Sequence, residues 1–474
     1  MLPNLLQTNK NMLKPNLYIR TLLVVAIMAG LGSCLVGPKY SEPAAIRQYT
    51  YRDSSTAYDT SALAPWFEVY KDPALQQLIK RTLDSNRNLL IAATRIEEAQ
   101  AQTAAIKANM WPKLGYNASA GGGRAGTDAT KVGGGLNSGA LKVFGVLDWE
   151  LDLWGRLRHS NQAAIAQLLG VTENRNALQA SLVAEVASLY FLLRDLDNRI
   201  EITKRTLAIR KESTRIITAR FDTGYIAELD KLQAIQQQAL AAASIPNFER
   251  QITQVENALR NLTGMGPGRI ERGLTNDEQN IPDIPVGIPS QLLRRRPDIR
   301  AGEYQLKAQL EQIGIAQANM YPRISLTGLL GFASPQLGTL LGNKGFVANG
   351  FAGLSGPVFA YGQNRSLVGV QRKRYDQAVY SYEQTILDAF SDVDNSLTFY
   401  RTYREEHDQV KILVDAARKA YQLTKARYDY GYSSYLEVII QETNLFEAQM
   451  QESFTRQQTL ASVVKLYRAM GGGW

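Results

Sequence analysis

The chain contains two copies of one sequence unit, and this duplication constrains its fold more than any other feature. Three segments recur in the same order at nearly constant spacing: 107–114 with 317–324, 219–224 with 426–431, and 259–264 with 466–471. The spacing changes only between 112 and 155 and between 322 and 362, where loops are expected because loops tolerate changes in length. A unit repeated twice is unusual for an enzyme with one active site and natural for a ring-shaped assembly.

The composition excludes several classes of site. The 474 residues include two histidines, His159 and His407, and one cysteine, Cys34. This inventory excludes a Cys/His metal cluster, a Cys-His catalytic dyad and a disulfide framework. The formal net charge of +9 is mild for this length and gives no reason to expect nucleic-acid binding. We therefore expect neither an enzyme nor a cofactor or metal site.

The N-terminus has the pattern of an export signal. Lys14 and Arg20 precede an apolar stretch over 21–31, which is followed by Gly-Ser-Cys34. The stretch is too short to span a hydrocarbon core of about 30 Å, so it predicts a cleaved signal peptide, with Met1 or Met12 as the start. The segment before Cys34 resembles a bacterial lipobox, which implies a covalent lipid on Cys34, diacylglycerol on the thiol and an N-acyl chain. The alternative is an ordinary signal whose cysteine is incidental.

Two long windows, 171–223 and 370–430, lack Gly and Pro and are rich in Ala, Leu, Gln and Glu. Apolar residues recur in them at spacings of three and four, which predicts long helices. Gly224 and Gly431 end these windows, and the helical pattern resumes directly afterwards. Each glycine therefore predicts a tight helix-turn-helix tip in which glycine takes the left-handed conformation. Shorter helices are expected over about 73–108 and 297–319.

Other segments alternate with a period of two. From Leu141 to Leu151 every second residue is apolar, which predicts a half-exposed strand. We expect strands over about 112–124, from 141, over about 322–332 and over about 351–360, in β-hairpins at about 112–153 and 322–360. Their length fits tilted transmembrane strands, but four strands are too few to close a barrel. Open edges in lipid are not viable, so several chains must pool their hairpins.

These features predict a mixed membrane α/β chain that is internally duplicated. The expected parts are a signal peptide 1–33, a lipid-anchored N-terminal segment 34–72, a first repeat 73–264, an inter-repeat equatorial linker 265–296, a second repeat 297–470 and a tail 471–474.

Five motifs, in order from residue 34 onward, resemble TolC-type outer-membrane efflux lipoproteins. They lie at 34–43, 66–75, 149–156, 288–299 and 356–365. The resemblance implies a homotrimer in the bacterial outer membrane, with a 12-stranded β-barrel of four strands per chain, a periplasmic 12-helix α-barrel and a small equatorial domain. It also implies the exit duct of a tripartite efflux system. Such a duct passively conducts drugs or other small molecules, which an inner-membrane transporter, often of the resistance–nodulation–division class, delivers through a periplasmic adaptor.

The resemblance places a gate at the two helix tips. It implies carboxylate rings in the trimer, a tyrosine–arginine network between the tips, and tip glycines that shape the turns and the adaptor-docking surface. The residues at these positions are Asp230 and Glu437 for the rings, Tyr428, Arg220 and Arg427 for the network, and Gly224 and Gly431 for the turns. The alternative is that they are solvated helix-end residues. Ile440 stands where many relatives carry a further Asp, which puts cation selectivity and the form of closure in doubt.

Two other functions stay open from the sequence: a lipid-anchored periplasmic scaffold or adaptor, and the duct of a type I protein secretion system. A scaffold would need only a helical hairpin, so the four alternating strands are the discriminating feature. The run 294–296 of three arginines is short and precedes Pro297, which favours a solvated helix start or a salt-bridged element over a nucleic-acid site. The glycine clusters 121–123 and 133–135 lack the Lys-Ser/Thr ending of a phosphate-binding loop, so they predict an ordinary loop.

Overall fold

The computed structural model describes residues 35–41, 70–121, 140–281, 295–334, 337–342 and 345–472. The predicted signal peptide and the predicted lipid site at Cys34 lie outside these ranges. The chain divides into two compact units. The strand unit comprises Met1–Pro43, Glu98–Leu169 and Tyr304–Tyr380, and the hairpin unit comprises Ala44–Glu97, Gly170–Glu303 and Ser381–Trp474. Each unit takes segments from both sequence repeats, so the repeats are not separate folding domains.

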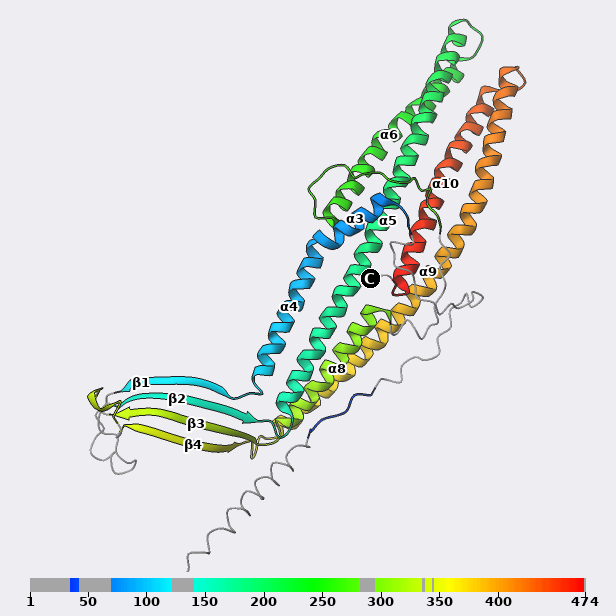
Figure 1. Ribbon diagram of the computed structural model, residues 1–474. Helices are drawn as coiled ribbons and strands as arrows, with labels where there is room; N and C mark the ends of the chain where they lie inside the picture. The colour runs from blue at the N-terminus through cyan, green and yellow to red at the C-terminus, as the bar shows by residue number, and fades with distance from the viewer. Residues whose placement is uncertain are drawn as a thin grey trace, which may run out of the picture. The chain divides into compact units, whose positions relative to one another are not determined.

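The strand unit contains one antiparallel sheet in the order β1-β2-β3-β4 (Figure 1). Its strands are β1 Lys113–Gly121, β2 Ala140–Leu151, β3 Arg323–Ser334 and β4 Phe346–Ser355, and a short 3-10 turn, Leu337–Thr339, follows β3. The central pair, β2 with β3, joins a strand of the first repeat to a strand of the second. This pairing explains why one repeat does not form a unit alone.

The register of the strands gathers the apolar residues on one face. Leu147 of β2 pairs with Leu114 of β1 on one side and with Gly328 of β3 on the other. The other members of this face are Tyr116, Ala118, Ala120, Leu141, Val143, Gly145, Trp149, Leu151, Ile324, Leu326, Leu330, Phe332, Phe346, Ala348, Gly350, Ala352 and Leu354. The opposite face is mixed: it carries the charged Lys142, Asp148 and Glu150 together with the apolar Phe144, Val146, Leu329, Val347 and Phe351. A sheet with one largely apolar face and charged residues confined to the other fits a transmembrane barrel wall.

A single chain leaves this sheet incomplete. Leu114 and Tyr116 are 84% and 88% exposed, and β1 and β4 are edge strands because each pairs with one of the described strands. Unpaired backbone groups at a sheet edge are not tolerated in lipid. The sheet therefore requires the edges of neighbouring chains.

The fourth strand differs from the prediction, which placed it at about 351–360. The strand runs over Phe346–Ser355, with Phe332 opposite Phe346 and Arg323 opposite Ser355. Gly356 and Pro357 follow, and proline has no backbone N–H with which to continue the ladder. The prediction was wrong because it assigned the first half of the strand to the preceding loop.

The helix expected over 73–108 is two helices, α3 Pro73–Ser85 and α4 Arg87–Ala108. Asn86 between them has an extended ψ of 124°. Its side-chain oxygen accepts from the amide of Leu89 at 3.1 Å, and its Nδ2 donates to the carbonyl of Leu262 at 2.8 Å. The interruption uses neither Gly nor Pro, so the sequence pattern alone did not reveal it.

The long helices come in two pairs of equal length. Helices α5 Arg156–Asp222 and α9 Gln363–Asp429 each have 67 residues, which corresponds to about 100 Å at 1.5 Å per residue. Helices α6 Glu228–Leu262 and α10 Tyr435–Ala469 each have 35 residues. Helix α8 spans Pro297–Ala318. Figure 1 shows α5 with α6, and α9 with α10, as two helical hairpins.

A core of the hairpin unit forms where α3, α5, α6 and α10 meet. Tyr190 and Phe191 of α5 have no exposed surface there, nor have Leu259 of α6 and Leu460 of α10. Among the described helices α5 alone is long and apolar enough to cross a membrane by composition, and 44% of that apolar window is buried inside the chain. This burial is typical of a core helix.

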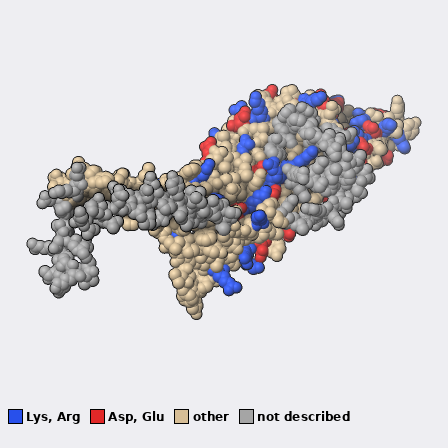
Figure 2. Space-filling view, turned by 60° about the horizontal axis from the view of Figure 1, so that its bottom comes forward, with Lys and Arg blue, Asp and Glu red and all other residues tan. Residues whose placement is uncertain are grey.

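Buried polar residues attach the inter-repeat linker to this core. The Asp72 carboxylate has no exposed surface, caps α3 and accepts from Tyr190 Oη at 2.9 Å, Leu274 N at 3.0 Å and Gln279 Nε2 at 2.7 Å. The predicted salt-bridged element at the arginine run is present at Arg296, which pairs with Asp298 and Asp392 at 2.6 and 3.2 Å. On the face seen in Figure 2, Lys and Arg are interspersed with Asp and Glu.

Candidate functional site

The two helix tips have the same backbone geometry. The first tip, residues 223–227, joins α5 to α6, and the second tip, residues 430–434, joins α9 to α10. Gly224 has a φ of 76° and Gly431 a φ of 81°. Each turn is closed by two backbone bonds: Gly224 N to Phe221 O at 2.8 Å with Tyr225 N to Arg220 O at 3.0 Å, and Gly431 N to Tyr428 O at 2.9 Å with Tyr432 N to Arg427 O at 2.8 Å. This is the Schellman arrangement, which requires the left-handed conformation that glycine adopts without strain.

The helices that leave the two tips begin differently. Helix α10 has a capping box, in which the Ser434 side chain accepts from the amide of Glu437 and the Glu437 side chain accepts from the amide of Ser434. Helix α6 begins after Ala227, which makes no side-chain cap. The exposed Glu437 carboxylate is therefore already engaged by its own helix end.

Arg220 connects the two hairpins. It lies in the last turn of α5, and its Nη1 donates to Tyr428 Oη in the last turn of α9 at 3.1 Å. The guanidinium carbon also lies 5.5 Å from the centroid of the Tyr428 ring, a cation–π distance. The Tyr428 ring is 5.7 Å from the ring of Tyr435 at the start of α10. Two of the predicted gate residues are thus brought together.

Arg427 occupies the position equivalent to Arg220, but among the described residues its side chain bonds only within its own tip. Its Nη2 donates to the carbonyl of Tyr432 at 3.4 Å. The two arginines share a sequence motif and not a role. Arg220 joins the hairpins, whereas Arg427 supports one turn.

A buried contact below the tips also joins the hairpins. Arg210 of α5 pairs with Glu442 of α10 at 2.9 Å, and their side chains are 5% and 12% exposed. Arg210 also donates to the carbonyl of Gln237 in α6 at 2.9 Å. Between this pair and the tips lies an apolar cluster: Ile217, Ala234, Tyr435, Val438 and Ile439.

The sequence analysis did not identify Arg210, Glu442 or Tyr435, because none of the three recurs at the equivalent position of the other repeat. A signal was nevertheless present for Arg210. It lies on the same helical stripe as the buried Thr203 and Ile217, at heptad spacing. A charged residue on a buried helical stripe predicts a partner of opposite charge or a hydrogen-bond acceptor in the fold.

The two predicted carboxylates differ in their surroundings. Asp230 is half-buried in the first turn of α6, and its carboxylate makes no hydrogen bond or ion pair with the residues that the structure describes. It lies close enough to Tyr435 to affect the titration of that phenol. The pKa of Tyr435 is raised to about 12, first by burial, then by the Glu442 carboxylate, with a smaller contribution from Asp230. Asp230 is therefore the carboxylate available for contacts outside the chain.

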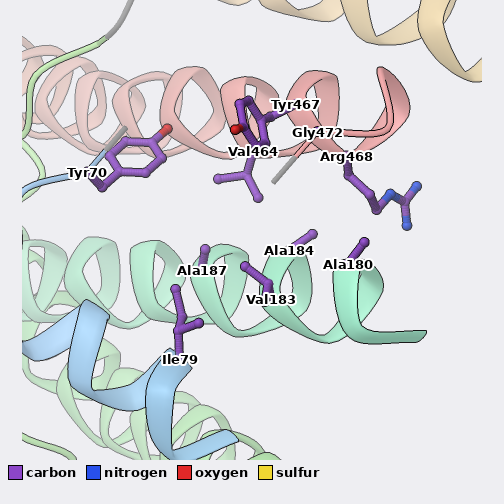
Figure 3. Close-up of a pocket in the computed structure, with 10 residues that line it drawn as sticks. All are labelled: Tyr70, Ile79, Ala180, Val183, Ala184, Ala187, Val464, Tyr467, Arg468 and Gly472. Atoms are coloured by element: carbon purple, nitrogen blue, oxygen red, sulfur yellow. The ribbon is translucent and has the colours of Figure 1, made fainter. Parts of the chain in front are cut away.

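An apolar pocket of about 30 Å³ lies between α5 and α10 in the hairpin unit, roughly the size of one water molecule (Figure 3). Its lining is Tyr70, Ile79, Ala180, Val183, Ala184, Ala187, Val464, Tyr467, Arg468 and Gly472. Within the described ranges no group of three or more His, Cys, Asp or Glu side chains is placed to hold a metal ion.

Comparison with known proteins identifies the family. The outer membrane efflux protein family matches residues 78–265 and 288–472. The toluene efflux pump outer membrane protein TtgC of Pseudomonas putida is 32% identical over 474 residues, covering 96% of each chain. Outer membrane protein OprJ of Pseudomonas aeruginosa is 32% identical over 470 residues, covering 98% of this chain and 97% of OprJ.

Solved structures agree with this identification. The open-state MtrE outer membrane channel of Neisseria gonorrhoeae superposes with a TM-score of 0.84 at 28% identity, covering 93% of this chain and 98% of MtrE. The outer-membrane channel OprN superposes with a TM-score of 0.83 at 28% identity, covering 93% and 100%.

The predicted fold class and location are thereby confirmed. The four strands form one third of a trimeric 12-stranded transmembrane β-barrel in the outer membrane, and the long helices form a periplasmic α-barrel. The assembly is the outer-membrane exit duct of an efflux system. The chain belongs to the outer membrane efflux protein family.

Proposed function

We propose that the duct is gated at its periplasmic end by the two helix tips, and that the bond between Arg220 and Tyr428 holds the hairpins in the closed arrangement. The observation that carries this proposal is the 3.1 Å hydrogen bond between the ends of α5 and α9. The two ends separate only if this bond and the stacked cation–π contact are broken. A charged donor makes such a bond worth about 1.5–3 kcal/mol, which suits a contact that must also open.

The carboxylates are proposed to act in the trimer. Three copies of Asp230 would form a ring at the start of α6, and such a ring attracts cations when it is desolvated. Glu437 would form a second ring but is also needed for its capping box. Asp230 is therefore the stronger candidate for a contact between chains or with a cation.

The proposed partners are a periplasmic adaptor and an inner-membrane transporter of the resistance–nodulation–division class. The relative TtgC, named as the outer membrane protein of a toluene efflux pump, supports a pump-associated duct. By analogy we assign small organic molecules as the cargo class. The duct conducts passively, so the choice of cargo lies with the transporter that delivers it.

The lipid on Cys34 is part of the proposal. It is supported by the lipobox-like sequence and by the position of the chain's single cysteine. Mass spectrometry of the mature N-terminal peptide tests it: a triacylated peptide that begins at Cys34 supports the anchor, and an unmodified thiol rejects it.

A periplasmic scaffold would lack a sheet with one continuous apolar face, so the sheet favours the duct. No feature of the described residues favours type I protein secretion over small-molecule efflux. The function is tested in cells that lack their own duct. Restored resistance to organic solvents only when transporter and adaptor are also present supports efflux, and restored toxin secretion instead supports the secretion duct.

The gate carboxylates are tested in planar bilayers. Replacing Asp230→Asn together with Glu437→Gln removes both rings and is expected to raise single-channel conductance and leak of antibiotics. Ser434→Ala is the matched control, because it removes the capping box without removing a charge. A double variant whose conductance equals that of the wild type would reject the carboxylate gate.

A further inference from the structure

The first described residues of the chain, 35–41, lie as an extended segment against the strand unit, and we refer to them as the N-terminal strap. The amide of Val36 donates to the carbonyl of Trp154, just before α5, at 3.3 Å. Tyr40, further along the strap, lies with its ring centroid 4.9 Å from the ammonium group of Lys307 on α8. The strap therefore contacts a helix start of the first repeat and a helix of the second.

His159 is the centre of this contact. Its side chain is 4% exposed. Its Nε2 lies 3.1 Å from the carbonyl oxygen of Val36, and its Nδ1 lies within hydrogen-bond distance of the Glu311 carboxylate on α8. Both ring nitrogens thus face acceptors. A neutral imidazole has one N–H donor, so both bonds form together only if the His159–Glu311 pair holds an additional proton.

Two glycines make room for the His159 ring. A Cβ atom on Gly37 of the strap would lie 2.9 Å from Cε1 of the ring. A Cβ atom on Gly314 of α8 would lie 2.6 Å from the same atom. Contacts this short do not occur, so a side chain at either position would displace the ring or the strap. The imidazole is held between two backbones, one from the strap and one from α8.

The other charged groups in this region have partners of their own. On α5, Arg156 pairs with Glu150 at 2.8 Å and Arg158 with Asp152 at 3.2 Å. On α8, Lys307 lies over the rings of Tyr40 and Tyr304. The strap contributes Lys39, which is exposed. Glu311 is the carboxylate that meets the His159 ring.

We propose that His159 and Glu311 form a clip that binds the N-terminal strap and fastens it to both sequence repeats, α5 of the first and α8 of the second. The ligand of this site is the chain's own N-terminal peptide.

The clip has a consequence for the lipid, which depends on the proposed acylation of Cys34. Consecutive Cα atoms are about 3.8 Å apart, so Cys34 lies within two peptide units of the Val36 residue that the clip holds. Val36 bonds to Trp154, close to where β2 ends at Leu151. An acyl chain on Cys34 would therefore be attached two residues from a segment that the clip holds near the end of β2.

The test measures strap mobility in the detergent-solubilised trimer. A nitroxide label on Lys39→Cys, an exposed strap position, is expected to give an immobilised spectrum. Adding His159→Ala is expected to abolish the immobilised component. Gly314→Ala is expected to do the same while keeping the histidine, and it suits the helix because alanine is a better helix former than glycine.

Two controls separate the clip from general loosening. Gly369→Ala changes a helical glycine whose new Cβ would meet nothing within 4 Å, and His407→Ile removes the other histidine, which lies in the hairpin unit. Both are expected to leave the label immobilised.

A mobile label in the wild type at neutral pH, or an immobilised label in both His159→Ala and Gly314→Ala, would overturn the clip. Recording channel conductance from the same preparations keeps the two proposals apart. If His159→Ala and Gly314→Ala conduct normally and their label stays immobilised, the clip is rejected and the duct is unaffected. If these variants lose the immobilised component in trimers that form no channel, the clip is supported and the duct is rejected.

Discussion

The two helical hairpins, α5–α6 and α9–α10, have nearly the same backbone and different side-chain contacts. Their helices have 67 and 35 residues in each copy, and both turns are closed by a left-handed glycine. Several equivalent positions nevertheless carry different side chains, and some of these side chains make the contacts between the hairpins. These pairs are Ile200 and His407, Arg210 and Ala417, Phe221 and Tyr428, and Ala227 and Ser434.

This difference separates the features that stayed the same in the two copies from those that diverged. The turn geometry needs one glycine at one place, so it is the same in both copies. A contact between two copies needs complementary partners, which identical side chains supply poorly. Tyr428 accepts from Arg220 through a hydroxyl that its counterpart Phe221 lacks. The hairpins therefore hold each other through residues that have diverged.

The largest effect is expected from Arg210→Ala, which makes the first hairpin like the second at this position. The change leaves the Glu442 carboxylate buried without its partner, and breaking a buried pair in this way costs about 3–5 kcal/mol. Thermal unfolding of the trimer in detergent should show a lower midpoint.

A double variant sharpens this prediction. Arg210→Met with Glu442→Leu removes both charges and should recover most of the lost stability, because apolar residues of similar volume replace a buried pair well. If Arg210→Ala were as stable as the wild type, the pair would not hold the hairpins together.

The next effect concerns His407, whose counterpart in the first hairpin is the buried Ile200. Burial, followed by the charges of Lys411 and Arg456, lowers the pKa of His407 from 6.5 to about 4. Below pH 6.5 His407 binds a proton in the unfolded chain but stays neutral in the folded chain. The free energy of unfolding therefore decreases as the pH falls toward 4. The full loss is about 3 kcal/mol.

His407→Ile should remove this dependence. We expect the wild type to lose thermal stability relative to His407→Ile between pH 6.5 and pH 4, while the two respond alike above pH 7. Parallel curves across the whole range would mean that the histidine titrates as freely in the folded chain as in the unfolded chain.

The sequence predicted those parts of the structure that depend on period and on glycine. The alternation at Leu141 to Leu151 predicted a strand with one apolar face, and Gly224 and Gly431 predicted the tips. It did not predict the helix break at Asn86, which depends on a hydrogen bond to Leu262 far along the chain. Contacts between distant segments leave no local pattern.

The same limit applies to the candidate site. The repeat pointed to Arg220 and Arg427 together, and only the fold shows that one joins the hairpins and the other supports its own turn. Glu437 fits a gate by position, yet its carboxylate belongs to a capping box with Ser434. Positions that did not repeat, such as Glu442, were missed for that reason.

A smaller effect is expected from Tyr428→Phe, which gives the second tip the residue of the first. The change removes the hydroxyl that accepts from Arg220 but keeps the ring beneath the guanidinium. Loss of this hydrogen bond from a charged donor, about 1.5–3 kcal/mol, shifts the ratio of open to closed channels by roughly 10- to 150-fold. Open probability in single-channel recordings gives this ratio, and Phe221→Tyr provides the reciprocal variant, which should leave it unchanged.

The smallest effect is expected at the helix starts. Ser434→Ala removes the cap of α10 and should cost about 0.5–1 kcal/mol, whereas Ala227→Ser gives α6 a cap that it lacks. Amide hydrogen exchange should accelerate in the first turn of α10 in the former and slow in the first turn of α6 in the latter. Equal exchange at both starts in the wild type would contradict the difference between the tips.

The most direct measurement compares Arg220→Ala with Arg427→Ala in single-channel recordings from planar bilayers. Both changes remove the same side chain from equivalent positions, but only Arg220 bonds to the other hairpin. A gate held between the hairpins predicts a higher open probability for Arg220→Ala and near wild-type behaviour for Arg427→Ala. Equal recordings from the two variants would contradict it.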